Sequence, residues 1–507
     1  MRVMGDIARL GAKRHPDRIA IVFGDAQLSY GQLDAFANRF AARLAAQGVL
    51  AGDRVALLAE NCIEYPVAVF AVLKLGAILL PLNFRYRADE VAYVVNDATP
   101  RCLLVGPGYE ALAAEASAVF EAPVPALELT AEVCADSEGA SPCPAPGTAV
   151  DPASAAMVMY TSGTTGFPKG VLFSHAAYLA SIVAIALSGG LESTDRVLVS
   201  LPLFHNGGLN ALLMPALAFG ARAVIAPKGF QPEAVLACVE QHRITLTMWV
   251  PTMLSMLVHS GALPRFDVSS LRRIWYGSSP ITPTLLGQVR GAFGAGLVQF
   301  YGLTETGMTA VLRPEDHAQW SHCTGREMFN ADMRIVDDAG ADVGVGALGE
   351  IVSRQEPMGM IGYINNDAAT REAIVDGWIR TGDVARNEGD GLFTIVDRKK
   401  DMLISGAENI YPKEIENVIA EHAGVLEVAV FGIPDPVYGE SVCAAVVPRP
   451  GTGMTEEAVV AWCTQRLAGY KKPRRVVFVS ELPKNAAGKV MKHVLKAPFW
   501  RDRERKV

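Results

Sequence analysis

A loop rich in hydroxyl groups and glycine is the segment whose residue types most clearly suit a chemical task. It consists of Thr161, Ser162, Gly163, Thr164, Thr165 and Gly166, followed by Phe-Pro-Lys169-Gly170. Backbone N–H groups and hydroxyls in such a loop can turn toward phosphate oxygens, and Lys169 adds a positive charge. It is not a Walker loop, because Pro168 and Gly170 flank the lysine where that motif has Gly and then Ser or Thr. An ordinary polar turn does not need four hydroxyl residues within positions 161 to 165, so the segment predicts a phosphate-binding loop.

Seven further segments follow this loop in a fixed order. They are PLFHNGG at 202–208, YGSSP at 276–280, YGLTE at 301–305, RTGD at 380–383, DRKKD at 397–401, GAENIYP at 406–412 and PKNAAGK at 483–489. Together with the loop they resemble the adenylate-forming superfamily, which includes acyl-CoA synthetases, 4-coumarate–CoA ligase, firefly luciferase and the adenylation domains of peptide synthetases. The resemblance covers nearly the whole chain.

The segment Tyr301-Gly-Leu-Thr304-Glu305 combines an aromatic face, a hydroxyl and a carboxylate directly after the apolar run LVQF. The resemblance implies that Tyr301 stacks on adenine, that Thr304 meets the α-phosphate and that Glu305 helps to bind Mg²⁺. These roles suit the residue types, because Mg²⁺ prefers hard oxygen ligands together with substrate phosphates. Taken alone, the pentapeptide would indicate only a turn at the end of a strand.

Two other segments are assigned to the nucleotide by the same resemblance. The backbone of Gly277, Ser278 and Ser279 is expected at the edge of the adenine. Asp383 is expected to accept hydrogen bonds from both ribose hydroxyls, for which a carboxylate has enough acceptor sites, and Arg398 is expected to reach the nucleotide as well. Without the resemblance, each of these segments would be an ordinary turn.

Three residues near the C-terminus are implied to serve the two steps of the reaction. Lys400 corresponds to a hinge, where backbone rotation moves the C-terminal unit between an adenylation pose and a thioester-forming pose. Lys489 is implied to bridge the substrate carboxylate and the α-phosphate, where a cation stabilises the charge that develops, and Gly406 is implied to line the approach of the thiol. Charge pattern alone would make both lysines solvated surface residues.

The sequence gives less information about the pocket for the acid. His205 matches a residue beside the acyl and thiol channel, and a buried, hydrogen-bonded histidine is an equal alternative. In the acetate-activating branch a tryptophan stands at the position of Gly302, so glycine there implies room for a larger acid, either aliphatic or aromatic. Trp249, Met253 and Met308 could line the pocket, although apolar residues belong more often to the core.

The elements that must position these residues alternate in type. From Tyr30 to about residue 105, helical and strand-like spacing alternate, and a second alternating stretch runs from about 155 to 330, which predicts α/β layers with mostly parallel sheets. Residues 331–399 have short strands between Gly and Asp turns. We therefore expect an α/β fold with α+β subdomains. Residues 1–399 would form an N-terminal adenylation domain that binds ATP and the acyl group, and residues 400–507 a small mobile α+β domain that carries the catalytic lysine.

Composition limits the classes of partner. Half of the residues are hydrophobic, a fifth are charged, and the net charge is -7, which is typical of a globular protein and argues against nucleic acid as a partner. The eight cysteines form no C-x-x-C pair, which favours the reduced cytoplasm. Both long uncharged stretches, 176–191 and 197–221, are too short or too interrupted to span a membrane. A homodimer is compatible with the sequence.

The resemblance therefore implies an ATP-dependent carboxylic acid–CoA ligase that uses ATP, Mg²⁺ and coenzyme A and acts on a fatty or aryl acid larger than acetate. Alternatively, the acyl adenylate is delivered to a carrier protein, to oxygen, or to an amine or other nucleophile. A non-catalytic protein that binds nucleotide or acyl adenylate belongs to a different class. That class predicts missing catalytic side chains, whereas Lys169, Glu305, Asp383 and Lys489 are all present.

Overall fold

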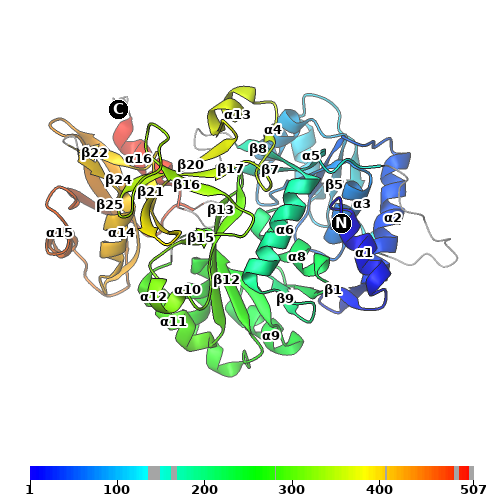
Figure 1. The fold of residues 1–507 in the computed structure, drawn as a ribbon, viewed down its shortest axis with the longest axis horizontal. Helices are drawn as coiled ribbons and strands as arrows, with labels where there is room; N and C mark the ends of the chain where they lie inside the picture. The colour runs from blue at the N-terminus through cyan, green and yellow to red at the C-terminus, as the bar shows by residue number, and fades with distance from the viewer. Residues whose placement is uncertain (135–148, 162–167, 280, 406–407, 485–489, 502–507) are drawn as a thin grey trace. The chain divides into compact units, whose positions relative to one another are not determined.

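The computed structural model describes residues 1–134, 149–161, 168–279, 281–405, 408–484 and 490–501. Contacts within the chain define two compact units (Figure 1). The first contains Met1–Met333 and Val352–Thr381, and the second contains Arg334–Ile351 and Gly382–Val507. The sequence predicts a domain boundary after residue 399, next to the hinge expected at Lys400, and this boundary stays a prediction.

A seven-stranded sheet in the first unit has the order β18-β8-β7-β4-β3-β5-β6. Its strands are β3 (Arg54–Leu58), β4 (Ile78–Leu82), β5 (Cys102–Val105), β6 (Ala126–Glu128), β7 (Ala155–Thr161), β8 (Lys169–Ser174) and β18 (Gly362–Tyr363). Strands β3 to β7 pair in parallel, whereas β8 is antiparallel to both β7 and β18. Within β3, Val55 and Leu57 join one apolar cluster while Ala56 and Leu58 join another. The sheet is therefore buried on both faces, as parallel sheets usually are.

A second sheet of the first unit has the order β15-β14-β13-β12-β11-β9-β10-β1-β2. These strands are β1 (Ile19–Phe23), β2 (Ala26–Ser29), β9 (Arg196–Val199), β10 (Arg222–Ile225), β11 (Leu246–Trp249), β12 (Arg273–Gly277), β13 (Gly296–Leu303), β14 (Gly307–Leu312) and β15 (Gly325–Glu327). The strands from β1 to β13 in this order are parallel, and β14 returns antiparallel to β13. Both alternating stretches of sequence thus form mainly parallel sheets, and the predicted α/β class is confirmed.

Helices fill three layers around these sheets. The largest apolar cluster lies between the sheets and includes α1 (Asp6–Arg14), α2 (Tyr30–Ala46), α3 (Glu64–Lys74), α6 (His175–Gly189) and α8 (Met214–Ala218). The outer face of the seven-stranded sheet is covered by α4 (Ala88–Ala98) and α5 (Glu110–Ser117). The outer face of the second sheet is covered by α9 (Pro232–His242), α10 (Pro251–His259) and α11 (Pro283–Phe293). Ser29 and Ser174 cap α2 and α6 by accepting backbone N–H groups.

The second unit is built around a long antiparallel hairpin of β24 (Val425–Asp435) and β25 (Gly439–Pro448). Helices α14 (Pro412–Ala420) and α15 (Glu456–Thr464) contribute to one apolar cluster against it, and α16 (Lys492–Trp500) contributes to another. Its other strands are β21 (Leu392–Arg398), β22 (Leu403–Ser405), β23 (Glu408–Ile410) and β26 (Arg475–Phe478), while β16 (Met333–Val336), β17 (Leu348–Arg354) and β20 (Trp378–Gly389) begin or end in the first unit.

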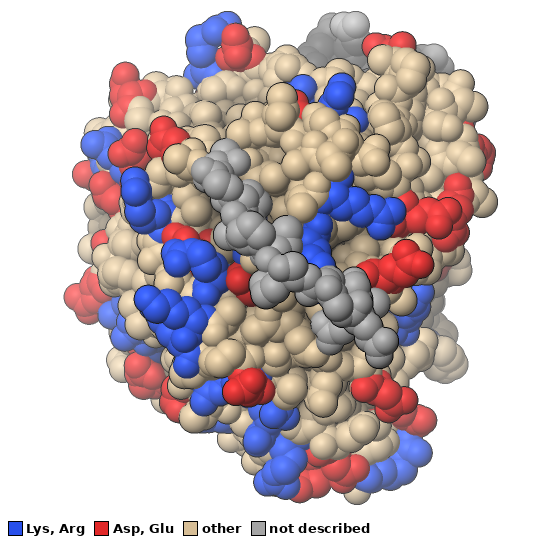
Figure 2. Space-filling view, turned by 90° about the vertical axis from the view of Figure 1, so that its right-hand side faces the viewer, with Lys and Arg blue, Asp and Glu red and all other residues tan. Residues whose placement is uncertain are grey.

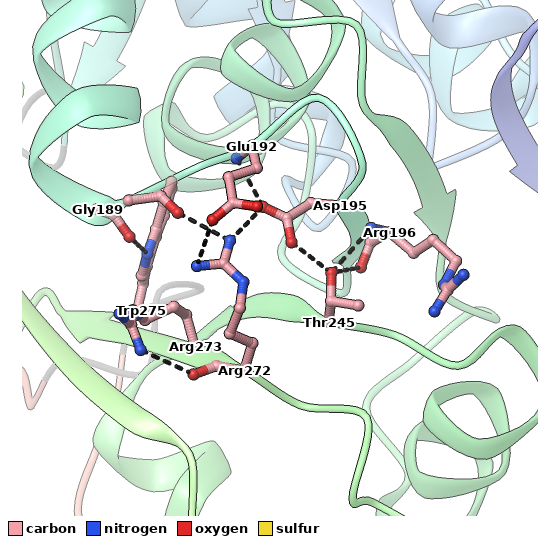
Figure 3. Close-up of polar contacts among 9 residues, drawn as sticks. Gly189, Glu192, Asp195, Arg196, Thr245, Arg272, Arg273 and Trp275 are labelled. Atoms are coloured by element: carbon pink, nitrogen blue, oxygen red, sulfur yellow. Dashed lines mark hydrogen bonds and ion pairs between the residues drawn. The ribbon is translucent and has the colours of Figure 1, made fainter.

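A buried carboxylate fixes the amino ends of three parallel strands in the first unit (Figure 3). Asp195, just before β9, accepts hydrogen bonds from the Thr245 hydroxyl at 2.6 Å and from the Glu192 backbone at 2.7 Å, and it pairs with the Arg272 guanidinium at 2.6 Å. Thr245 and Arg272 directly precede β11 and β12. In open α/β sheets ligands bind at the opposite, carboxyl ends of the strands.

The surface carries charges of both signs. On the face seen in Figure 2, acidic and basic side chains are interspersed rather than gathered by sign. Within the part of the chain that the structure describes, none of the helices combines the length and apolar character needed to cross a bilayer.

Candidate active site

The phosphate-loop segment connects two paired strands. Thr161 ends β7 and Lys169 begins β8, and the two residues are partners in the antiparallel register. The Thr161 hydroxyl donates to the Lys169 carbonyl oxygen at 3.5 Å. The predicted phosphate ligands Ser162, Gly163, Thr164, Thr165 and Gly166 lie outside the described residues. A strand therefore lies on each side of the segment, β7 before it and β8 after it.

The predicted adenine segments end two neighbouring parallel strands. Strand β12 ends at Gly277, which is paired with Phe300 of β13, and Tyr301 follows on β13. A Cβ atom at Gly277 would collide with the Phe300 carbonyl oxygen, so the two backbones approach closely here. Ser278 then adopts a left-handed backbone conformation with φ of 69°, which is costly for a residue other than glycine. The segments expected to hold adenine therefore lie at one edge of the sheet, with strained backbone at the exit of β12.

The turn between β13 and β14 carries Thr304 and Glu305 and is held from outside the hairpin. The Thr306 hydroxyl accepts the Leu303 N–H at 3.1 Å within the turn. The Glu305 carbonyl accepts the Met360 N–H at 2.9 Å, and the Glu305 carboxylate accepts the Tyr363 hydroxyl at 3.0 Å.

Tyr363 also meets the predicted phosphate-binding lysine. The Lys169 ammonium lies 5.1 Å from the centroid of the Tyr363 ring, within cation–π range. Burial, and then the neighbouring Glu305 carboxylate, raise the pKa of Tyr363, so the phenol keeps its proton and remains a donor. Nothing in the sequence singles out Tyr363, because a tyrosine in a Gly-Tyr pair carries no local sign of a site.

Gly302 has a backbone role in addition to the one inferred for the acid pocket. A Cβ atom at this position would collide with the Gly307 carbonyl oxygen and the Met308 backbone across the β13–β14 hairpin. The hairpin register shifts between Tyr301 and Gly302, which brings the strands into this close contact. The close approach of the two strands in this hairpin therefore leaves no room for a Cβ atom at Gly302, apart from any effect of this position on the acid pocket.

His205 begins a short helical stretch, α7 (Asn206–Gly208), that continues into the π-helical turn Leu209–Leu213. Turns of π-helix are frequent at functional sites. The His205 side chain is exposed, with its ring centroid 5.4 Å from that of Phe204. Desolvation by the neighbouring protein, and then the positive charge of Arg85, lower the pKa of His205.

Trp249 belongs to the core. It is fully buried, its indole N–H donates to the Ser200 hydroxyl at 3.1 Å, and its ring packs 5.6 Å from that of Phe293. Met253 and Met308 are partly buried against the apolar clusters.

The second unit contains the predicted ribose ligands. Asp383 and Arg398 are cross-strand partners on β20 and β21, and the Arg398 Nε atom lies 3.0 Å from the Asp383 carboxylate. The Asp383 side chain is 5% exposed. Lys400 occupies a turn in which the Asp401 N–H donates to the Arg398 carbonyl at 2.9 Å. Gly406 and Lys489 lie outside the described residues.

Comparisons with known proteins establish the family. A family model for AMP-binding enzymes matches residues 9–364, and the model for the AMP-binding enzyme C-terminal domain matches residues 414–489. The chain belongs to the AMP-binding enzyme family, and the resemblance to adenylate-forming acyl-CoA synthetases is confirmed.

Individual relatives indicate the type of reaction more closely. The chain is 40% identical over 486 residues to indoleacetate–CoA ligase of Aromatoleum aromaticum, with 94% of each chain covered. It is 38% identical to feruloyl-CoA synthase of an Amycolatopsis species, covering 96% of this chain and 97% of that one. The solved structure of the amide bond synthetase McbA from Marinactinospora thermotolerans superposes with a TM-score of 0.89 and 33% identity over 98% of this chain and 99% of that one. The predicted ATP-dependent, adenylate-forming acid–CoA ligase activity is confirmed, and ATP and coenzyme A are its co-substrates.

Proposed function

We propose that the acid activated by this ligase carries an aryl group, and that the enzyme prefers coenzyme A to other acyl acceptors. Relatives named for indoleacetate and ferulate, at 40% and 38% identity, support an aryl acid. A fatty acid is the second candidate, supported by the long-chain-fatty-acid–CoA ligase FadD13 of Mycobacterium tuberculosis at 34% identity. Other acceptors also have support, because a fatty acid–[acyl-carrier-protein] ligase of Streptomyces coeruleorubidus is 35% identical and McbA is an amide bond synthetase.

For the nucleotide we propose a site built from the first unit's loop and turn. The loop from Thr161 to Gly166 and Lys169 would hold phosphates, Thr304 the α-phosphate, and Tyr301 with residues 277–279 the adenine. The proposal rests on Tyr363, which contacts the Lys169 ammonium through its ring and the Glu305 carboxylate through its hydroxyl. These two contacts bring the cation predicted for the phosphates near the carboxylate predicted for Mg²⁺. In the second unit, Asp383 and Arg398 would hold the ribose.

Mg²⁺ fits this set of donors. Among the described residues no group of three or more His, Cys, Asp or Glu side chains could cage a metal, whereas Mg²⁺ commonly binds through one or two carboxylates plus substrate phosphates. Glu305 would be that carboxylate. The ion would neutralise negative charge on the phosphates when bound.

The chemistry proceeds in two steps. A substrate carboxylate oxygen bonds to the α-phosphorus of ATP. The bond between the α-phosphorus and the oxygen that bridges to the β-phosphate breaks, and pyrophosphate leaves. Lys489 would stabilise the charge that develops. The coenzyme A sulfur then bonds to the acyl carbon, its thiol proton is lost, and AMP leaves. Between the steps the domain 400–507 would turn relative to 1–399 at Lys400, with Gly406 lining the thiol's approach and His205 beside the acyl channel.

We further propose a cytoplasmic location and a homodimer. The cytoplasm supplies ATP and coenzyme A, and six cysteines among the described residues are free thiols, which suits a reducing compartment. Light scattering on the purified protein measures its mass directly, and a monomeric mass would rule out the dimer.

A pyrophosphate-release screen tests which class of acid the enzyme activates. It compares aryl, arylalkyl, short, medium and long fatty acids, and amino acids, and then offers coenzyme A, a carrier protein or an amine as acceptor. The highest kcat/KM should fall on an aryl-containing acid with coenzyme A. A preference for fatty acids or for another acceptor would overturn the corresponding half of the proposal.

The variant Lys489→Ala separates the two steps. It should lose pyrophosphate release from acid plus ATP while still converting preformed acyl adenylate to thioester. Equal loss of both steps would contradict the role assigned to Lys489.

A further inference from the structure

The segment from Met360 to Ile364 joins the phosphate-loop hairpin to the turn that carries Glu305. On the hairpin side, the Ile361 N–H donates to the Leu172 carbonyl at 2.7 Å and the Ile364 N–H donates to the Gly170 carbonyl at 2.8 Å. These bonds fix the short strand β18 against β8 at Val171 and Leu172, two and three residues beyond Lys169. The segment therefore moves with the strand that begins at the phosphate-binding lysine.

The same segment forms hydrogen bonds to Glu305 at two points. The Met360 N–H donates to the Glu305 carbonyl at 2.9 Å, and the Tyr363 hydroxyl donates to the Glu305 carboxylate at 3.0 Å. The first bond fixes the backbone of the turn, and the second fixes the orientation of the carboxylate. The Thr370 hydroxyl in turn accepts the Tyr363 N–H at 2.9 Å, so Tyr363 is itself anchored.

The face of the Tyr363 ring completes the arrangement. The Lys169 ammonium lies 5.1 Å from the ring centroid, a distance at which the ring attracts a cation. One side chain thus contacts the phosphate-binding cation through its ring and the metal-binding carboxylate through its hydroxyl. Core packing alone would account for the ring, but it would not account for a hydroxyl directed at a carboxylate in the turn.

We infer that Tyr363 is a positioning residue that sets the Glu305 carboxylate and the Lys169 ammonium at the spacing that Mg²⁺-ATP requires. The inference rests on the function proposed above for these two residues. The phenol orients the carboxylate so that one oxygen faces the metal, in the way that outer partners orient metal ligands generally. The ring holds the lysine near the phosphates before the nucleotide arrives.

The variant Tyr363→Phe tests this role, because it removes the hydroxyl and keeps the ring. Binding of ATP with and without Mg²⁺, and binding of AMP, are measured by calorimetry in the absence of any acid. We expect the affinity for Mg²⁺-ATP to fall by about tenfold, as is usual when the partner of a metal ligand is removed. The affinities for metal-free ATP and for AMP should stay at the wild-type values.

A double mutant separates positioning of Glu305 from any other effect. In a Glu305→Gln background the phenol faces an uncharged amide, so Tyr363→Phe should cause little further loss of Mg²⁺-ATP affinity. Tyr30→Phe is the matched control. It also removes a buried phenol, whose hydroxyl donates to the Ala221 carbonyl at 2.6 Å, but it lies outside the site and should leave all three nucleotide affinities unchanged.

Two results would overturn the inference. One is wild-type Mg²⁺-ATP affinity in Tyr363→Phe, and the other is an equal loss of affinity for AMP, which would make Tyr363 a general packing residue. Failure of the nucleotide site proposed above looks different, because Glu305→Gln alone would then leave the affinity for Mg²⁺-ATP at the wild-type value.

Discussion

Replacement of Asp383 by asparagine tests the ribose site with little change of shape. The Asp383 side chain is 5% exposed and lies 3.0 Å from the Arg398 Nε atom. Asparagine keeps an oxygen acceptor but loses the charge, and charge-assisted hydrogen bonds are roughly twice as strong as neutral ones. If both ribose hydroxyls donate to Asp383, the loss is about 1 kcal/mol for each bond. The sum of about 2 kcal/mol corresponds to about a 30-fold rise in the KM for ATP.

The assay compares ATP with 2′-deoxy-ATP in pyrophosphate release. The wild-type enzyme should prefer ATP by about tenfold, because the deoxynucleotide lacks one hydrogen bond to a charged acceptor. In Asp383→Asn this preference should fall to about twofold, because a loss of about 1 kcal/mol for this bond leaves about 0.4 kcal/mol. The ratio of the two nucleotides reports on the ribose contact and is insensitive to a general loss of stability.

Asp397→Asn is the control for this experiment. Asp397 is also buried, and it accepts the backbone N–H groups of Arg398 at 2.7 Å and Lys413 at 2.8 Å. Its replacement should lower stability and leave the preference for ATP over 2′-deoxy-ATP unchanged. If Asp383→Asn keeps the wild-type preference, Asp383 does not contact the ribose, and its role is to hold Arg398.

Three further predictions concern stability. Ser278→Gly should raise the unfolding free energy by about 1 kcal/mol, seen as a higher thermal midpoint, because Ser278 has a left-handed φ of 69°. Burial lowers the pKa of His175 from 6.5 to about 4. Between these pH values the histidine is therefore protonated in the unfolded state and neutral in the folded state. Stability is therefore complete above pH 6.5 and falls by up to about 3 kcal/mol toward pH 4 in urea titrations, a slope that His175→Gln should remove. Asp195→Ala leaves Arg272 and Thr245 without the acceptor drawn in Figure 3 and should cost about 3 kcal/mol by chemical denaturation, with the KM for ATP unchanged.

The sequence predicts the elements of the site better than their contacts. Apolar runs on both sides of the hydroxyl-rich loop predict strands, and β7 and β8 are found there. The run LVQF before Tyr301 likewise lies in β13. These features are local, because alternation and turn residues within ten positions specify them. The hydrogen bond between Tyr363 and Glu305 joins residues 58 positions apart, and only the pairing of β18 with β8 creates it.

The β-rich stretch between residues 331 and 399 shows a second limit. Its strands are predicted from Gly and Asp turns, yet residues 334–351 and 352–381 belong to different compact units. Strand β17, Leu348–Arg354, crosses the division. Because a pattern read along the chain assigns contiguous segments, it cannot divide a strand between two units, and this division follows from packing alone.

The contacts of the cations explain how an acidic chain can bind a polyanion. With a net charge of -7, attraction for ATP must come from individual groups. Arg398 lies 3.0 Å from Asp383 and Lys492 lies 2.7 Å from Glu416, so either cation would have to leave a carboxylate partner to turn to a phosphate. Lys169 instead rests on an aromatic face, a contact worth about 0.5–1 kcal/mol at exposed sites. Turning to a phosphate would therefore cost Lys169 this weak contact, whereas it would cost Arg398 or Lys492 an ion pair.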